Sequence, residues 1–325
     1  MSTKYPVRRK NTIAVSGTDT THKPPESEFF ESATKTFLRN CKLRNLSSST
    51  ITYYVDVLKM LTRLMNGIGV QRPLDVTHEH IHEAIIIKRN EGVKDATIDK
   101  YMRGWRAFFN FMETEGFLPT NPFDKVAIMK SEKRIIETFS KPQIKALLES
   151  QKKTTFTGYR NYVLMLLLLE TGVRVSEAAA IKVTDINWKE RLIKVYGKGR
   201  KERYVPFQKT LERHLNEYVS IRGFLEHDFL FVNIDNTPLK VRTMQEVIAQ
   251  AGKDAKVTGV RVSPHTFRHT MAKMYVMNGG DPLSLQLILG HTSLEMCRNY
   301  VRLFSSDVAI KHARHSPLEN MDNDY

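Results

Sequence analysis

Four short stretches in the second half of the chain combine cationic and proton-transferring side chains. They read TGVRVSE, YGKGRKERYVP, SPHTFRHT and LGHTSLEMCRNY. Their candidate reactive residues are two arginines, two histidines, a lysine and a tyrosine, namely Arg174, Arg268, His265, His291, Lys198 and Tyr300. No carboxylate cluster or Cys/His metal-ligand set accompanies them in the sequence. This set suits attack on a phosphodiester without metal ions, where fixed cations neutralise the non-bridging oxygens as charge develops.

Each stretch by itself leaves a plain structural alternative open. Arg174 lies at an expected helix start just after Gly172, where a guanidinium can bind phosphate. It could equally cap the helix or pair with Glu177. The glycines beside Lys198 let the backbone approach a ligand closely, but a basic hairpin tip ending at Lys201 is also typical of a solvated turn.

The two remaining stretches are similarly open. His265 and Arg268 are three residues apart and share one helix face, where they could transfer a proton, hold an anion or form an ordinary surface pair. Tyr300 falls nine residues after His291, and a tyrosine at such a place is ordinarily core or surface filler. The chemical interpretation is favoured only because all six residues occur in this order.

The first half of the chain is predicted to be helical. Apolar spacing and helix-start signals indicate helices over residues 29–41, 50–65, 77–89 and 96–112, with Ser47 to Ser49 as N-cap candidates for the second. The Trp and Phe residues of the last helix are expected in the core of a four-helix domain. Pro119 and Pro122 then indicate a break before a second domain.

The second domain is predicted to begin at Phe139, with a helix start at Ser140. An apolar helix from Tyr159 to Thr171 is followed by two short strands, 192–196 and 202–206, which form a hairpin. The remainder indicates helices interrupted by glycine and proline.

Composition limits the function classes. The chain has 325 residues and 50 Lys plus Arg against 35 Asp plus Glu, a net charge of +15 that favours a polyanionic partner. Charge alone leaves RNA, anionic membranes and other proteins open. Two distant cysteines, Cys41 and Cys297, exclude a disulfide scaffold, and the longest apolar run cannot span a bilayer. A soluble cytoplasmic protein is expected.

The ordered stretches resemble those of the tyrosine recombinases, the family of phage integrases and Xer recombinases. The Arg174 to Lys198 interval of 24 residues and the His291 to Tyr300 interval of nine are similar to the Xer pattern. The resemblance covers residues 139–305, with a looser match over the N-terminal helices. It implies a mainly α fold with a small β-hairpin or sheet, in which a four-helix core-binding domain precedes a mixed α/β catalytic domain.

The resemblance also implies a division of the chain. We expect a disordered basic arm over residues 1–25 and a core-binding domain over 26–115. A linker over 116–138 then leads to the catalytic domain over 139–303. A tail over 304–325, amphipathic through Phe304, Val308 and Ile310, could dock on a neighbouring protomer.

The same resemblance implies a role for each residue. Tyr300 would attack the scissile phosphorus and form a 3′-phosphotyrosyl link, releasing a 5′-hydroxyl. His265 would act as the base, because free tyrosine has a pKa near ~10. Arg174 and Arg268 would clamp the non-bridging oxygens.

The remaining roles concern the leaving group and the support of the site. Lys198 would protonate the 5′-oxygen, with Lys201 as the weaker candidate, and His291 would donate a further hydrogen bond to the phosphate. Glu177 would support His265 or Arg174. No cofactor and no ATP are expected, because the phosphotyrosyl link conserves the bond energy.

The implied partner is double-stranded DNA at a specific recombination site, bound by a homo-tetramer on two sites and by no membrane. The free protein is expected to be a monomer or dimer. Candidates for further DNA contacts are exposed basic residues, namely Lys42, Arg44, Lys100, Arg103, Arg106 and Lys201.

Two alternatives stay open at this point. A type IB topoisomerase uses similar chemistry, and a non-catalytic DNA-binding protein could share the fold. The Xer-like spacing and the complete set of six favour a recombinase. The DNA target and the choice among integration, excision and resolution cannot be read from the chain, although its length favours a recombinase of a mobile element.

Overall fold

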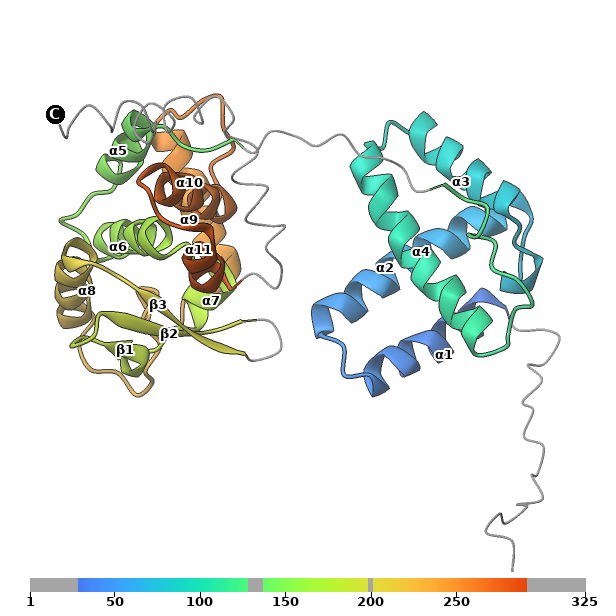
Figure 1. Ribbon diagram of the computed structural model, residues 1–325, viewed down its shortest axis with the longest axis horizontal. Helices are drawn as coiled ribbons and strands as arrows, with labels where there is room; N and C mark the ends of the chain where they lie inside the picture. Colours follow the sequence, from blue (N-terminus) through green and yellow to red (C-terminus); the bar gives the residue numbers. More distant parts are fainter. Residues whose placement is uncertain (1–28, 128–136, 198–200, 291–325) are drawn as a thin grey trace, which may run out of the picture. The chain divides into compact units, whose positions relative to one another are not determined.

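The computed structural model describes residues 29–127, 137–197 and 201–290. Residues 29–127 belong to one compact unit, and the other described residues belong to a second (Figure 1). The described part is mostly helical with one small sheet, so the predicted fold class is confirmed. The expected arm over residues 1–25 and the expected tail over 304–325 lie outside the described residues.

The first unit is built from the four predicted helices. They are α1 (Phe30–Leu43), α2 (Ser48–Ile68), α3 (His78–Asn90) and α4 (Asp95–Thr114), with a 3-10 turn η1 (Pro73–Asp75) before α3. Ser47 caps α2 by accepting a hydrogen bond from the Thr50 amide. Gly69 ends α2 in the left-handed region at φ 90°, where the lack of a Cβ removes the steric penalty. The predicted cap of this helix is therefore confirmed.

Aromatic side chains fill the centre of the first unit. Trp105 is fully buried and donates its indole N–H to the Val57 carbonyl at 2.8 Å. The ring of Phe37 meets the ring of Phe108 edge to face, with centroids 5.7 Å apart. This arrangement confirms that these aromatic residues form the core, as predicted, rather than exposed platforms for nucleic-acid bases.

The segment after α4 belongs in part to this core. Leu118, Phe123 and Val126 are buried in it, and the Arg106 guanidinium donates to the Val126 carbonyl at 3.0 Å. The sequence assigned this stretch to a linker because of its prolines. The prolines end the helix, but the apolar residues between and after them still pack back onto the helices.

The second unit contains most of the candidate site. Its helices are α5 (Lys141–Glu149), α6 (Phe156–Thr171), α7 (Val175–Ala180), α8 (Lys209–Arg222), α9 (Val241–Asp254), α10 (Pro264–Met277) and α11 (Pro282–Leu289). A 3-10 turn, η2 (Val183–Asp185), precedes the strands β1 (Ile186–Asn187), β2 (Leu192–Tyr196) and β3 (Glu202–Pro206). The strands form one antiparallel sheet in the order β1-β2-β3. The predicted hairpin is confirmed, and β1 was missed because two residues carry no readable alternation.

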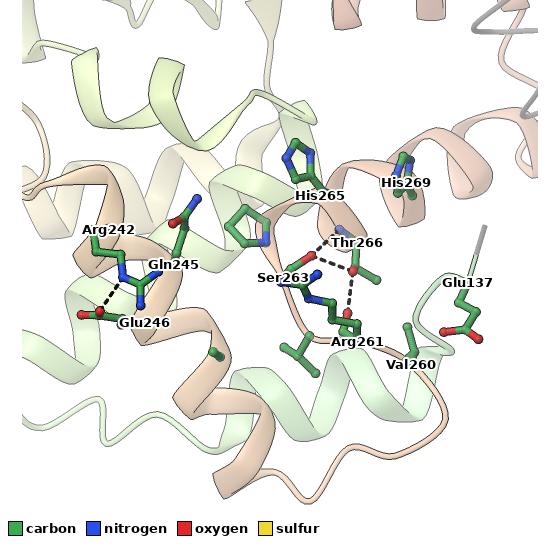
Figure 2. A pocket seen from close by; sticks show the side chains of 13 residues that line it. Glu137, Arg242, Gln245, Glu246, Val260, Arg261, Ser263, His265, Thr266 and His269 are labelled. Atoms are coloured by element: carbon green, nitrogen blue, oxygen red, sulfur yellow. Dashed lines mark hydrogen bonds and ion pairs between the residues drawn. The ribbon is translucent and has the colours of Figure 1, made fainter. Parts of the chain in front are cut away.

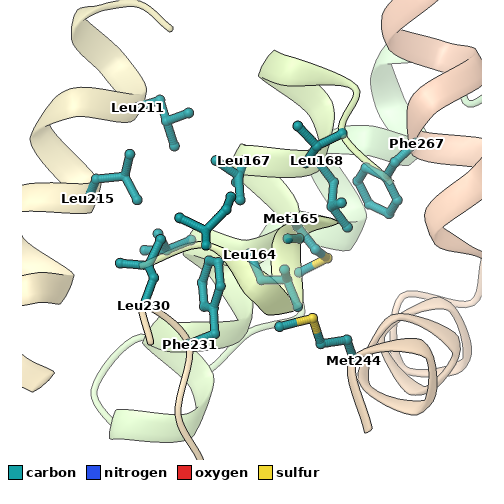
Figure 3. Close-up of a cluster of buried hydrophobic side chains, with 14 of the residues drawn as sticks. Leu164, Met165, Leu167, Leu168, Leu211, Leu215, Leu230, Phe231, Met244 and Phe267 are labelled. Atoms are coloured by element: carbon teal, nitrogen blue, oxygen red, sulfur yellow. The ribbon is translucent and has the colours of Figure 1, made fainter. Parts of the chain in front are cut away.

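Helix α6 is the central element of this unit, and its apolar side chains face neighbours on several sides (Figure 3). Leu164, Leu167 and Leu168 are fully buried there. Leu211 and Leu215 of α8 and Phe267 of α10 belong to the same cluster. A helix that is apolar around most of its circumference is typical of such a position. Its C-terminal end is therefore held rigidly, and the candidate site begins at that end.

We predict that Leu168→Ala lowers the free energy of unfolding by roughly 2–5 kcal/mol, because the truncation leaves a cavity in this core. Leu287→Ala is the matched control, since Leu287 is 75% exposed, and it should change stability by about 0.5 kcal/mol or less. Urea unfolding followed by circular dichroism measures both. Equal losses for the two variants would contradict the assignment of α6 as the central core helix.

Candidate active site

The first part of the site is the junction between α6 and α7. Helix α6 ends at Gly172, which has φ 60°, and Arg174 is the N-cap of α7. The Arg174 amide donates to Glu177 Oε2 at 2.8 Å, and its Nη1 donates to Oε1 at 2.9 Å. The Arg174 side chain nevertheless keeps 37% of its surface exposed. The two interpretations that the sequence left open are thus compatible, because the paired guanidinium still presents an exposed surface to an anion.

A second arginine, Arg203 of β3, completes the surroundings of Glu177. Its Nη1 and Nη2 donate to the two carboxylate oxygens at 2.9 and 2.8 Å, and Glu177 is only 3% exposed. Burial by itself raises the pKa of the Glu177 carboxyl. The hydrogen bonds from Arg203 and Arg174 outweigh this effect and hold the pKa below its ordinary value. Glu177 is therefore a carboxylate, and it bonds to Arg174, one of the two partners proposed from the sequence.

Arg203 was not among the site residues predicted from the sequence. A signal was present, because Arg203 and Val205 alternate with exposed residues along the predicted strand. Arg203 therefore shares a strand face with a fully buried valine. A charged residue on the buried face of a strand requires a partner, which here is Glu177.

Arg268 of α10 is the third cation, and it is 4% exposed. Its Nη1 donates to the Gly172 carbonyl and its Nη2 to the Leu289 carbonyl, both at 2.7 Å. Gly172 precedes Arg174 by two residues, and Leu289 precedes His291 by two. One guanidinium thus joins the chain segments that carry two of the other candidate residues.

His265 lies in the first turn of α10, where Ser263 caps the helix by accepting from the Thr266 amide at 3.3 Å. His265 as a whole is exposed to solvent. Partial burial of the ring lowers its pKa, and the positive charges of Arg268 and Arg174 lower it further. The imidazole is therefore mainly neutral at pH 7 and can accept a proton. Arg174, Arg268 and His265 consequently form one group.

A hollow of about 490 Å³ lies beside His265 (Figure 2). His265 and His269 line it from successive turns of α10, and α9 contributes polar side chains such as Gln245. Arg242 of α9 is paired with Glu246 at 2.7 Å. Neither Arg174 nor Arg268 lines the hollow, so it lies next to the arginine group rather than at its centre.

His269 is a second residue that the sequence analysis did not assign. Burial lowers its pKa to about 4, and the neighbouring His265 and Arg268 contribute to the shift. Its position one turn after His265 could have been read from the spacing of the two histidines.

The structure does not describe the other three predicted residues of the six. Lys198, His291 and Tyr300 are outside the described residues, so their assignment stays a prediction. Lys201 is exposed, and its carbonyl accepts a hydrogen bond from the Gly197 amide at 2.8 Å where the hairpin strands approach their tip.

The proposed DNA contacts of the first unit differ in how freely they face solvent. Lys42 and Arg44 are exposed at the end of α1. Arg103 is 76% exposed but pairs with Asp99 at 2.8 Å, and Lys100 lies 5.3 Å from the centre of the Tyr53 ring. Arg106 is half-buried, and its guanidinium also lies 5.3 Å from the Phe123 ring centre. Arg106 thus has a packing role in addition to any contact with DNA.

The described residues contain neither a metal-binding cluster nor a membrane-spanning helix. Within residues 29–127, 137–197 and 201–290, no group of three or more His, Cys, Asp or Glu side chains is arranged to hold a metal ion. No helix in the same ranges has the length and apolarity needed to cross a membrane.

Residues 137–306 match the sequence model of the phage integrase family, which is more than half of the chain. The chain belongs to this family, the tyrosine recombinases. The predicted resemblance is confirmed, and this tyrosine recombinase is a site-specific DNA recombinase. The tyrosine recombinase XerC of Bacillus subtilis is 28% identical over 281 residues, which cover 84% of this chain and 92% of that relative.

Two solved structures share the fold of this tyrosine recombinase. The integrase of transposon Tn1549 in complex with transposon right end DNA has a TM-score of 0.71 and 18% identity. That match covers 87% of this chain and 98% of the other. A lambda integrase tetramer bound to a Holliday junction has a TM-score of 0.70 and 19% identity, covering 82% and 78% of the two chains.

We predict that Gly172→Ala damages both stability and cleavage. A Cβ at Gly172 would lie 2.8 Å from Leu289 Cδ2 and 3.1 Å from Met271 Sδ, in a backbone conformation with positive φ. The expected loss of stability is roughly 2–4 kcal/mol. Because the carbonyl that binds Arg268 must shift, DNA cleavage should fall as well.

Gly279→Ala is the control for this substitution, because Gly279 also has positive φ but no heavy atom within 4 Å of an added Cβ. Gly279→Ala should lose only the smaller part of the stability, which comes from placing a side chain at positive φ. Its cleavage rate should stay that of wild type. Urea unfolding and a cleavage assay measure the two effects. Similar cleavage by both variants would refute the importance of this close approach.

We also predict that His269 makes the folded protein less stable as the pH falls. Its pKa lies below the ordinary value of 6.5, at about 4, so the unfolded chain binds more protons between these values. The contribution of His269 to the free energy of unfolding is therefore fully present above about pH 6.5 and is lost as the pH falls towards 4. The loss is at most roughly 3 kcal/mol, reduced by the partial exposure of the ring.

His269→Gln removes the titrating group, so its unfolding free energy should depend less steeply on pH over this window. Urea unfolding at a series of pH values gives the slope. An identical slope for wild type and variant would contradict the prediction.

Proposed function

We propose that this tyrosine recombinase cleaves DNA by attack of the Tyr300 hydroxyl on the scissile phosphorus. The bond from phosphorus to the 5′-oxygen breaks as the bond to tyrosine forms, which leaves a 3′-phosphotyrosyl link and a free 5′-hydroxyl. The observation that carries the proposal is the Arg268 guanidinium, which bonds both the Gly172 and Leu289 carbonyls. It brings together the segment that carries Arg174 and the chain that leads to Tyr300.

Arg174 and Arg268 are the proposed phosphate clamp. Their fixed charges would neutralise the non-bridging oxygens as negative charge develops in the transition state. The exposure of the Arg174 side chain supports this role. Arg268 is buried, so it would orient its neighbours and add positive charge from below the surface.

His265 is the proposed base that removes the proton from Tyr300. Its lowered pKa supports this assignment, because a neutral imidazole is available at pH 7. Lys198 is the proposed acid for the 5′-oxygen, with Lys201 as the weaker candidate. His291 would donate a hydrogen bond to the phosphate, and Glu177 would support Arg174.

The proposed substrate is double-stranded DNA at a specific site, bound by a homo-tetramer on two such sites. The similarity to the lambda integrase tetramer on a Holliday junction supports this assembly. The similarity to the Tn1549 integrase supports a role in integration, excision or resolution of a mobile element. The tail over residues 304–325 would dock on a neighbouring protomer. We place the enzyme in the cytoplasm, which suits a chain whose only two cysteines, Cys41 and Cys297, are far apart in the sequence.

Exposed basic residues of the first unit would add sequence-independent phosphate contacts. Lys42, Arg44, Lys100 and Arg103 have the exposure that such contacts require, as does Lys201 in the second unit. Arg106 is the least accessible of the proposed set. The ranges 1–25, 26–115, 116–138 and 139–303 would serve as arm, core-binding domain, linker and catalytic domain, with the start of the linker packed into the core of the first unit.

A covalent adduct tests the proposed reaction. The bound site is first located by footprinting, and a nicked version of it is then offered as a suicide substrate, from which the short 5′-hydroxyl strand diffuses away. We predict that the wild-type chain accumulates a DNA adduct resistant to denaturation and that Tyr300→Phe accumulates none, because it lacks the attacking oxygen.

Gel electrophoresis in detergent detects the adduct, and Tyr204→Phe provides a matched control at an exposed tyrosine. An adduct with the Tyr300→Phe variant would reject Tyr300 as nucleophile. No adduct with wild type on its footprinted site would reject the enzymatic function.

A further inference from the structure

We propose that Arg203 is a positioning residue that keeps Arg174 effective as a cation by neutralising Glu177. The inference rests on the proposed function, since it takes Arg174 as part of the phosphate clamp. Arg203 itself lies in β3 and is 13% exposed, so it acts through Glu177 and Arg174 rather than by touching DNA.

Charge counting gives the first argument. Arg174 and Glu177 alone would form a neutral pair, in which the carboxylate competes with the scissile phosphate for the same guanidinium. With Arg203 the group holds two positive charges and one negative charge, a net charge of +1. Because Glu177 is buried, water cannot screen its charge effectively, and a second cation is the means of compensating it.

Hydrogen-bond geometry gives the second argument. Arg203 presents both of its Nη atoms to Glu177 in the bidentate form, whereas Arg174 uses one Nη and its backbone amide. The carboxylate thus receives four donors from two arginines. Arg203 is the bidentate partner. The Arg174 guanidinium bonds to Glu177 through Nη1, and 37% of that side chain stays exposed.

The contacts of Arg203 with the end of α11 give the third argument. Its Nε donates to the Ile288 carbonyl at 2.8 Å. A Cβ added to Gly290 would lie 3.0 to 3.1 Å from the Arg203 Cδ, Nε and Cζ atoms, so the glycine backbone packs directly against the arginine. Arg203 consequently binds Glu177 and the end of α11 with one planar guanidinium.

A purely structural arginine would make the same contacts, and a double substitution that removes both charges separates the two roles. Arg203→Met keeps most of the side-chain volume but leaves Glu177 paired with Arg174 alone. Glu177→Gln combined with Arg203→Met removes the competing carboxylate as well. If Arg203 acts by neutralising Glu177, the second substitution should restore part of the activity that the first removed.

The experiment measures the rate of adduct formation by the full chain on its footprinted nicked site, at saturating protein. We expect Arg203→Met to react about 100-fold more slowly than wild type. The double variant should react at least about tenfold faster than Arg203→Met. The rate of Arg203→Lys should lie between those of wild type and Arg203→Met, because lysine keeps the charge without the bidentate geometry. Circular dichroism and site binding confirm that each variant is folded.

Three results would overturn the inference. They are a wild-type rate for Arg203→Met, a double variant as slow as or slower than Arg203→Met, and an Arg203→Lys variant no faster than Arg203→Met. If Arg203→Met fails to fold, the Lys variant and the Glu177→Gln background still report the charge effect. Absence of an adduct with wild type would reject the proposed function instead, so the two failures are distinguishable.

Discussion

The architecture of the site depends on a buried arginine that bonds two helix ends. Arg268 is 4% exposed, and burying its charge would be costly without compensation. Its acceptors are the carbonyls of Gly172, at the C-terminal end of α6, and Leu289, at that of α11. Helix C-termini carry partial negative charge, so both ends stabilise the guanidinium. The same bonds fix the distance between the two ends, which explains why Gly172, with Leu289 and Met271 against it, leaves no room for a side chain.

The second constraint is the balance of charge around Glu177. In the proposed mechanism this group attracts phosphate and so needs a net positive charge, yet its cations also need a counter-charge that fixes their geometry. One buried carboxylate shared between Arg174 and Arg203 satisfies both requirements, because orientation is fixed while a net positive charge remains. Hydrogen bonds from the two arginines hold the pKa of the Glu177 carboxyl low, whereas partial burial, followed by the charges of Arg268 and Arg174, lowers the pKa of His265.

Local signals in the sequence predicted the helices and the hairpin well, because Ser47, Ser140 and Ser263 cap the helices that they precede. The motif order predicted the family. What could not be predicted was tertiary: Arg203 meets Glu177 across 26 residues of chain, and Arg268 meets Gly172 across 96. Such pairs depend on which faces meet after the core has formed. Burial of Leu118 and Val126 against the first unit escaped prediction for the same reason.

In the proposed mechanism the arginine group stabilises negative charge on the scissile phosphate, and a DNA substrate with a methylphosphonate in place of that phosphate is the sharpest test of this role. The substitution removes one negative oxygen and so reduces the need for a cation. On the phosphate substrate, Arg174→Ala should form adducts far more slowly than wild type. On the methylphosphonate, its rate should lie within about tenfold of wild type. An equal loss on both substrates would contradict the claim, because Arg174 would then act through structure and not through the charge of the phosphate.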